Sequence, residues 1–250
     1  MRIAALSDIH SNVFALDAVI RDAKGRGVEL MLNLGDICYG PIAPRATYDL
    51  LNEHDFVTIS GNQDRQIHEA TGKELEANPT MRFVSEDLGP APISWLKSLP
   101  FDRQLDDEVY LCHGSPTDDT AYLLEDVESG HARLRSDPEI VALLGGQRSG
   151  VILCGHTHTA RTVALSTGQV VVNPGSVGLP AYTDDEPVVH SMESFSRHAA
   201  YSMLERGVSG WTIQNILVPY DDRKAAAAAK NQGREDWACF LTTGRGLKQP

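Results

Sequence analysis

Histidine, aspartate and asparagine side chains gather in five short segments of this 250-residue chain, each of which follows an apolar run. The side chains in these segments that could bind a metal are Asp8, His10, Asp36, Asn62, His113, His156 and His158. Imidazole, carboxylate and amide oxygen together suit Mn, Fe, Co, Ni or Zn ions. No thiolate belongs to the seven, which argues against a closed structural zinc site. The set predicts a metal centre assembled from distant segments.

The number of candidate ligands is enough for two divalent metal ions that share one carboxylate. Asp36 is the natural bridge, because it follows its apolar run alone, between two groups of ligands. His156 and His158 lie two residues apart, and on a tight loop they can reach different ions. We therefore expect two divalent metal ions as the cofactors, and the residues leave the identity of the metals open.

The apolar runs that precede these segments predict buried strands. Short runs closed by glycine or polar residues indicate strands at 2–7, 30–34, 56–60, 109–112 and 151–154, and later strands are expected at 170–172, 199–205 and 211–218. Polar residues beyond the carboxyl ends of strands are where ligands bind in α/β proteins. All five segments occupy such positions, which is the structural reason to assign them to one site.

Helical patterns alternate with the early strands and predict an α/β fold. Apolar residues recur at helical spacing after Asn12, a suitable N-cap, and other helices are expected at 43–54, 92–99, 225–230 and, as a pair separated near Gly130, within 117–144. This order favours two packed sheets with helices outside. We expect a single domain over 1–250, in which about 221–250 form a C-terminal helical extension.

Composition narrows the class of partner. The formal net charge is −12, which does not favour nucleic-acid binding, because that needs a basic face. The chain has no long uncharged apolar run to span a membrane, and its first ten residues do not have the pattern of a signal peptide. Its four cysteines show no CxxC spacing, which fits a reduced compartment. We expect a cytoplasmic protein that acts on a small molecule.

The segments DIH, GD, GNQD, HG and GHTH, followed by NPGS at 173–176, resemble the calcineurin-like metallophosphoesterase superfamily, closest to its small bacterial and archaeal phosphodiesterase-type branch. The resemblance implies a four-layer α/β/β/α sandwich of two mixed β-sheets flanked by helices. It also implies hydrolysis of a small phosphoester by a hydroxide that bridges two metals. One metal would bind Asp8, His10, Asp36 and His158, and the other would bind Asp36, Asn62, His113 and His156.

One position departs from the common form of the family, in which GNH stands where this chain has GNQ. The resemblance implies that Asn62 binds metal and that Asp64 orients the residue at position 63. We expect catalytic roles for Gln63, as a donor to the phosphoryl group, and for Arg65, which would add positive charge near the transition state. Glutamine can donate a hydrogen bond but cannot deliver a proton near neutral pH. Loss of a general acid harms esters with poor leaving groups most, so we expect a phosphodiesterase rather than a monoesterase.

Two other functions stay open at this stage. A catalytically weakened metal-binding module or scaffold would explain the glutamine, and a nuclease is a further alternative, although the acidic balance disfavours it. Segments 39–45, 78–87, 115–135 and 178–185 are expected to surround the site. Tyr39 and Tyr182 could stack on a ring of the substrate, and Arg45 and Arg161 could meet a second phosphate. The sequence predicts no oligomeric state.

Overall fold

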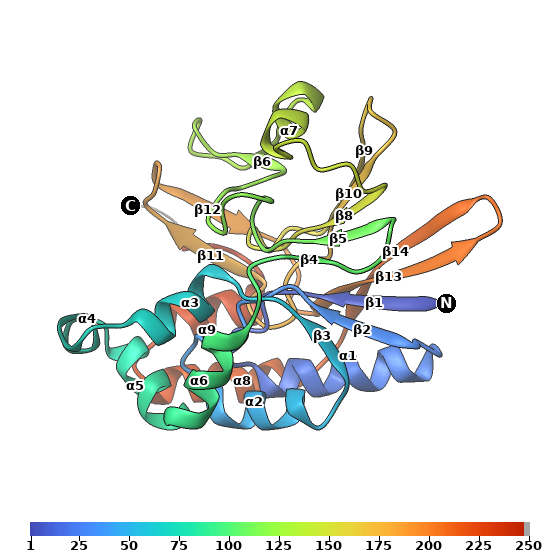
Figure 1. Cartoon of the computed structure of the whole chain (residues 1–250). Helices are drawn as coiled ribbons and strands as arrows, with labels where there is room; N and C mark the ends of the chain where they lie inside the picture. Colours follow the sequence, from blue (N-terminus) through green and yellow to red (C-terminus); the bar gives the residue numbers. More distant parts are fainter. Residues whose placement is uncertain (248–250) are drawn as a thin grey trace.

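The computed structural model describes residues 1–247, and its first sheet has the strand order β14-β13-β1-β2-β3 (Figure 1). The strands β1 (Arg2–Leu6), β2 (Leu30–Asn33) and β3 (Phe56–Thr58) run parallel. The hairpin of β13 (Ala199–Gly207) and β14 (Gly210–Val218) joins β1 antiparallel. The sheet is therefore mixed, and the carboxyl ends of its parallel strands lie at one edge.

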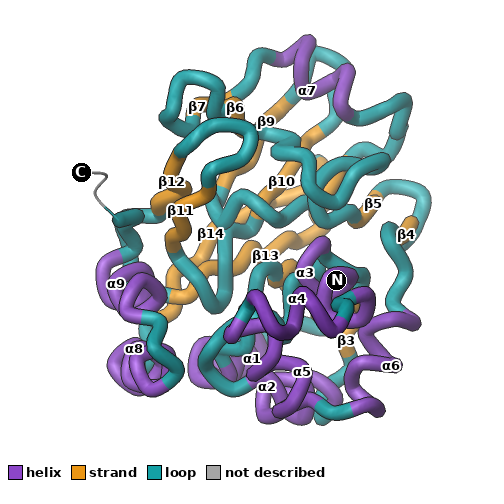
Figure 2. Tube along the Cα trace, turned by 90° about the vertical axis from the view of Figure 1, so that its left-hand side faces the viewer, coloured by secondary structure: helices purple, strands orange, loops and turns teal. Residues whose placement is uncertain are grey.

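A second mixed sheet packs against the first, with the order β4-β5-β8-β10-β9 (Figure 2). Its central strands β5 (Val109–Leu111), β8 (Val151–Leu153) and β10 (Val170–Asn173) are parallel. The edge strands β4 (Arg103–Gln104) and β9 (Arg161–Ala164) pair with them antiparallel. Two small hairpins lie outside these sheets, β6 (Glu125–Asp126) with β7 (Arg133–Leu134) and β11 (Ala181–Asp184) with β12 (His190–Glu193).

Helices cover the outer faces of both sheets (Figure 1). The helices are α1 (Val13–Gly25), α2 (Pro44–Asn52), α3 (Asn62–Glu69), α4 (Gly72–Ala77), α5 (Pro79–Leu88), α6 (Pro90–Ser98), α7 (Asp137–Leu143), α8 (Asp222–Asn231) and α9 (Glu235–Thr243). Most of them lie against the first sheet, and α7 lies on the far side of the second. The expected four-layer arrangement of two mixed sheets between helices is confirmed. Within residues 1–247, no helix is long and apolar enough to cross a membrane.

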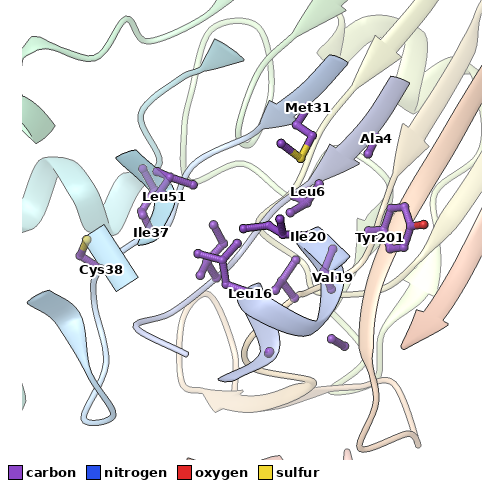
Figure 3. Packing of buried hydrophobic residues seen from close by; sticks show 14 of the residues in the cluster. Ala4, Leu6, Leu16, Val19, Ile20, Met31, Ile37, Cys38, Leu51 and Tyr201 are labelled. Carbon is purple, nitrogen blue, oxygen red and sulfur yellow. The ribbon is translucent and has the colours of Figure 1, made fainter. Parts of the chain in front are cut away.

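Successive side chains of β1 point to opposite faces of the sheet, and the apolar residues on both faces are buried. Ala4 and Leu6 pack against α1 in the outer core, part of which Figure 3 shows. Ile3 and Ala5 face the opposite way and pack between the two sheets. A strand with apolar residues on both faces must lie between two layers, which fixes β1 at the centre of the molecule.

Of the two helices expected within 117–144, the first is wrong and the second corresponds to the shorter α7. The structure has a loop there, followed by β6 and β7, and then α7 at Asp137–Leu143. The backbone amides of Thr117 and Asp118 bind the hydroxyl of Ser115, and the backbone amide of Thr120 binds the carboxylate of Asp118. These local side-chain bonds compete with a helix, so the segment folds as turns. The helices α4 and α5 were not expected from the sequence, whereas α9 lies within the expected C-terminal helical extension.

Candidate metal centre

The ends of five strands, three in the first sheet and two in the second, bring the seven expected ligand residues to one place. Asp8 follows β1, Asp36 follows β2, His113 follows β5 and the pair His156 and His158 follows β8, while His10 lies two residues beyond Asp8 and Asn62 begins α3 just after β3. Six of them form two groups, and in each group the potential ligand atoms lie within 4.8 Å of one another. We call these two groups, with Asn62, the candidate metal centre.

The first group consists of Asp8, His10 and His158, all of them buried. The Nε2 atoms of His10 and His158 are 3.0 Å apart. The Asp8 Oδ1 atom is 3.4 Å from Nε2 of His158 and 4.0 Å from Nε2 of His10. Three potential ligand atoms thus converge on one point.

The second group consists of Asp36, His113 and His156, and Asn62 lies beside it. The Nε2 atom of His113 is 3.5 Å from Asp36 Oδ1 and 3.0 Å from Asn62 Oδ1. The other Asp36 oxygen, Oδ2, lies 3.9 Å from His10 Nε2 in the first group. The carboxylate of Asp36 therefore directs one oxygen toward each group.

The histidine rings are held so that one lone pair of each faces the centre. The Nδ1 atoms of His10, His113 and His158 contact the carbonyl oxygens of Tyr39, Leu34 and Leu179 at 3.2, 2.7 and 2.6 Å. Because a carbonyl only accepts, each Nδ1 carries a proton, so the neutral form of each ring has its lone pair on Nε2. For His156 the roles exchange, since its Nε2 lies 2.9 Å from the Thr120 carbonyl.

This arrangement fits a cation. In the tautomers that the carbonyl contacts at Nδ1 favour, the Nε2 lone pairs of His10 and His158 face each other at 3.0 Å. The Asp8 Oδ1 atom is buried and has no hydrogen-bond partner within residues 1–247. Buried polar atoms are nearly always satisfied, so an orphaned carboxylate oxygen beside two facing imidazole nitrogens matches the donor set of a divalent ion.

Charge at the centre is set by burial and by close neighbours. Burial, together with the nearby imidazole of His158, lowers the pKa of His10 to about 4, and burial with His113 lowers the pKa of His156 to about 4. Burial would also lower the pKa of His113, but the carboxylate of Asp36 and its other partners outweigh it and raise the pKa to about 10. Metal binding requires neutral imidazoles, so an ion would displace the proton from His113.

The backbone at these residues is strained. Five of the seven residues have φ between 48° and 68°, the left-handed region that residues other than glycine rarely adopt. They are Asp8, His10, Asp36, His156 and His158. Such conformations cost on the order of 1–3 kcal/mol each and concentrate at functional sites. The surrounding loops must therefore hold them in place.

Asp64 is one of the residues that hold these loops together. Its carboxylate accepts hydrogen bonds from the backbone amides of Asp36 at 2.8 Å, Ile37 at 2.9 Å and Gly61 at 3.0 Å. Burial and the charge of Asp36 raise the pKa of Asp64 to about 7. A Cβ atom on Gly61 would lie 2.2 Å from Asp36 Oδ1, so glycine is needed where the loops after β2 and β3 meet.

The residues expected to contact substrate differ in whether they line the cavity at the candidate metal centre. Gln63 lines a cavity of about 410 Å³ above it, and its backbone amide donates to Asp36 Oδ1 at 2.9 Å. Arg65 makes two bonds to Asp119, at 2.8 and 2.9 Å. Arg45 bonds to Asp49 and Arg161 to Glu125, and neither arginine lines this cavity.

Two of the four expected surrounding segments line this cavity, with Tyr39 from the first and Leu179 and Tyr182 from the fourth. Residues 115–135 line a neighbouring cavity that shares Asn62 and His156. Residues 78–87 form part of α5 and line neither cavity. The sequence placed α9 only within a C-terminal helical extension and gave no role to it at the cavity, although the apolar residues in the stretch 237–241 indicate a buried helix.

Comparison with known proteins defines the class of this chain. Residues 1–194 match the model of the calcineurin-like phosphoesterase superfamily domain. The uncharacterized protein MJ0912 of Methanocaldococcus jannaschii is 39% identical, and the match covers 94% of each chain. This protein belongs to the calcineurin-like phosphoesterase superfamily, whose members are metal-dependent phosphoester hydrolases.

Solved structures have the same fold. A metallophosphoesterase from Sphaerobacter thermophilus is similar with a TM-score of 0.73 and 22% identity, over 98% of this chain and 100% of that one. Hypothetical protein PH1004 from Pyrococcus horikoshii gives a TM-score of 0.76 at 19% identity, over 98% and 99% of the two chains. These likenesses agree with the two mixed sheets and flanking helices described above.

Proposed function

We propose that this protein is a phosphodiesterase for small phosphorylated molecules that uses two divalent metal ions. The observation that carries this proposal is the position of Asp36, with Oδ1 3.5 Å from His113 in one group and Oδ2 3.9 Å from His10 in the other. A carboxylate between two sets of imidazoles is what a bridged pair of cations requires. Asp8, His10, Asp36 and His158 would hold one ion, and Asp36, Asn62, His113 and His156 the other.

The bound ions would supply the charge that neutralises a phosphoryl group and lowers the pKa of water. The protein residues supply position. Backbone carbonyls fix the tautomers of His10, His113 and His158, so their Nε2 lone pairs stay directed inward. Asp64 holds the loops of Asp36 and Gly61 through backbone amides. Preorganisation of this kind means that little rearrangement is needed when substrate binds.

The residue at position 63 supports a diester as substrate. Gln63 lines the cavity, and its Oε1 atom is buried without a partner among the described residues. Donation to a phosphoryl oxygen would come from the Nε2 atom of the same amide, which cannot protonate a leaving alcohol. General acid catalysis contributes roughly 10²- to 10⁴-fold. A phosphodiester with a stable leaving group loses least when this contribution is missing.

The proposal is tested by turnover of bis-p-nitrophenyl phosphate before and after removal of metal. We expect activity in Mn²⁺, loss of that activity after chelation and dialysis, and recovery when Mn²⁺ returns. The control repeats the assay after addition of Mg²⁺ and of Zn²⁺, which separates metal preference from protein damage. Tight Mn²⁺ binding without turnover of any phosphomonoester or phosphodiester would instead favour a metal-binding module.

Gln63→His is expected to change the dependence on the leaving group. The imidazole can donate a proton, so hydrolysis of alkyl phosphodiesters should rise by about tenfold or more, while p-nitrophenyl esters change little. The measurement is kcat/KM for a series of diesters whose leaving groups differ in pKa. Gln63→Asn, which supplies no acid, is the matched control. An unchanged slope of log kcat/KM against leaving-group pKa would contradict a role for position 63 in protonation.

A further inference from the structure

The helix α9 forms one wall of the cavity above the candidate metal centre. Arg234, Asp236, Trp237 and Phe240 line this cavity together with His10, Asp36 and His158. These four residues lie beyond residues 1–194, the part of the chain that matches the family domain. In Figure 2, α9 lies beside β11. Residues of β11 also line the cavity. This wall therefore comes from outside the part of the chain that matches the family domain, and it borders the space beside the candidate metal centre.

Packing fixes the position of this wall. Trp237 and Phe240 are each 4% exposed and share a core with Leu179, Ala225 and Ala229. The ring of Trp237 meets the ring of His10 edge-on, with centroids 5.8 Å apart. Such a densely packed contact leaves little freedom for the ring to move. The aromatic edges that face the cavity are thus preorganised relative to the candidate metal centre.

The remaining lining is also aromatic. Tyr39 and Tyr182 face the same cavity from two other loops. The hydroxyl of Tyr39 accepts from Asn78 at 3.1 Å, and the hydroxyl of Tyr182 donates to Tyr122 at 3.0 Å, so both polar ends are already bonded. Their aromatic rings contribute apolar surface to the lining. A small site bounded by four aromatic residues favours a flat apolar group, through burial and edge or face contacts.

The charges of the cavity do not favour a second phosphate. Arg234 is the sole Arg or Lys in its lining, as far as the described residues go. Its guanidinium bonds to Asp236 at 2.9 and 2.6 Å and to Thr80 Oγ1 at 2.7 Å, and it lies 5.4 Å from the centre of the Trp237 ring. This arginine is already paired, while Asp184 adds negative charge to the lining. A group that binds here should carry no charge of its own.

We infer that Trp237 and Phe240 determine substrate specificity by binding an uncharged aromatic arm of the phosphodiester. The inference rests on the proposed function, because the phosphoryl group must bind at the candidate metal centre for the arm to reach α9. The volume of about 410 Å³ is enough for a phosphoryl group with one ring-bearing arm. If α9 binds this arm, the preferred substrates are small phosphodiesters that have an aromatic substituent.

The test compares ligands that differ in one arm only. Monomethyl esters of methylphosphonate, cyclohexylphosphonate, phenylphosphonate and 4-carboxyphenylphosphonate keep the same phosphoryl charge, and their P–C arm cannot be hydrolysed. Their affinities for the Mn²⁺-supplemented protein are measured by calorimetry. We expect the phenyl ligand to bind roughly ten- to fifty-fold more tightly than the methyl ligand, from the apolar area that it buries. It should also bind more tightly than the cyclohexyl and carboxyphenyl ligands.

Substitutions in α9 then test whether its side chains cause the preference for the phenyl ligand over the methyl ligand. Trp237→Leu and Phe240→Leu should each reduce the ratio of phenyl to methyl affinity at least threefold, while Thr242→Ala, which lies on another face of α9, should keep it. Phe240 is not in ring contact with His10, so its variant separates arm binding from damage at the histidines. Equal affinities for phenyl and methyl ligands, an unchanged ratio in both leucine variants, or tighter binding of the carboxyphenyl ligand would overturn the inference.

The two proposals can fail separately. Metal-dependent turnover with no aromatic preference would refute the role of α9 and leave the phosphodiesterase intact. An aromatic preference in calorimetry without turnover of any phosphoester would refute the phosphodiesterase and support the binding site at α9.

Discussion

Asp36→Asn should lower Mn²⁺-dependent turnover of bis-p-nitrophenyl phosphate by about a thousandfold or more, because it removes the charge shared by two cations. The asparagine has nearly the same shape, and its side-chain oxygen can still accept from the backbone amide of Gln63, as Asp36 does at 2.9 Å. The fold should therefore survive, and the loss would report on charge. Activity is measured together with the metal content after dialysis, which should fall from two ions to one or none.

Asp49→Asn is the matched control for this substitution. The carboxylate of Asp49 is half exposed on α2 and pairs with Arg45, away from the candidate metal centre. An exposed pair of this kind contributes at most about 1 kcal/mol, so activity and metal content should stay at the wild-type level. Retention of more than a tenth of wild-type turnover by Asp36→Asn would refute the bridging role.

Gly178→Ala should destabilise the protein by about 3 kcal/mol or more, since overpacking against rigid backbone has no easy relaxation. A Cβ atom at this position would lie 1.7 Å from the carbonyl oxygen of Ile9. Gly178 is also held by its backbone, which donates to the Asp8 carbonyl at 3.0 Å and accepts from the Asn12 side chain at 2.9 Å. The change is measured as the free energy of unfolding in urea.

The control for this prediction is Gly72→Ala, at the first position of α4. A Cβ atom there would meet no atom of the described residues within 4 Å. Alanine is the better helix former, so the free energy of unfolding should stay unchanged or rise by up to about 1 kcal/mol. Equal stabilities of the Gly178 variant and the wild type would show that the loops around Ile9 can move apart, contrary to the packing described above.

The ligand residues and the strands before them could be predicted because both are local features. Each run such as Arg2–Leu6 or Val109–Leu111 is apolar on consecutive residues, which indicates a strand buried on both faces, and the polar residue after it lies at the edge of the sheet. Parallel pairing places Asp8 beside Asp36 at the edge of one sheet, and His113 beside His156 at the edge of the other. The packing of the two sheets then brings the two pairs together, and this step is not a local feature of the sequence.

The segment 117–144 shows where local reasoning fails. Leu123 and Leu124 lie in the first part of this segment, where a helix was expected, but they belong to a loop and pack in the core on the outer face of the second sheet. Turn-forming bonds from Ser115 and Asp118 decide the local conformation. The side chains that make these bonds are visible in the sequence, but their advantage over a helix depends on the sheet that the loop covers.

The role of Asp64 and the wall of α9 also required tertiary structure. Asp64 lies next to Gln63 in the chain, yet its carboxylate bonds to the amides of Asp36 and Ile37, 28 and 27 residues away. Trp237 is 227 residues from His10 in the numbering, and their rings are in contact. Contacts at such separations arise from the packing of whole layers, so spacing along the chain contains no signal for them.

The sequence by itself determined which chemical groups meet, because strand patterns and ligand types are encoded within a few residues of each other. It thus indicated the family, the layered fold and the pair of metal groups. Tertiary structure alone decided how the rings are oriented, which arginines are already paired and which helix covers the cavity. Those features depend on the exact distances between elements far apart in the chain, and these distances determine which substrate can fit.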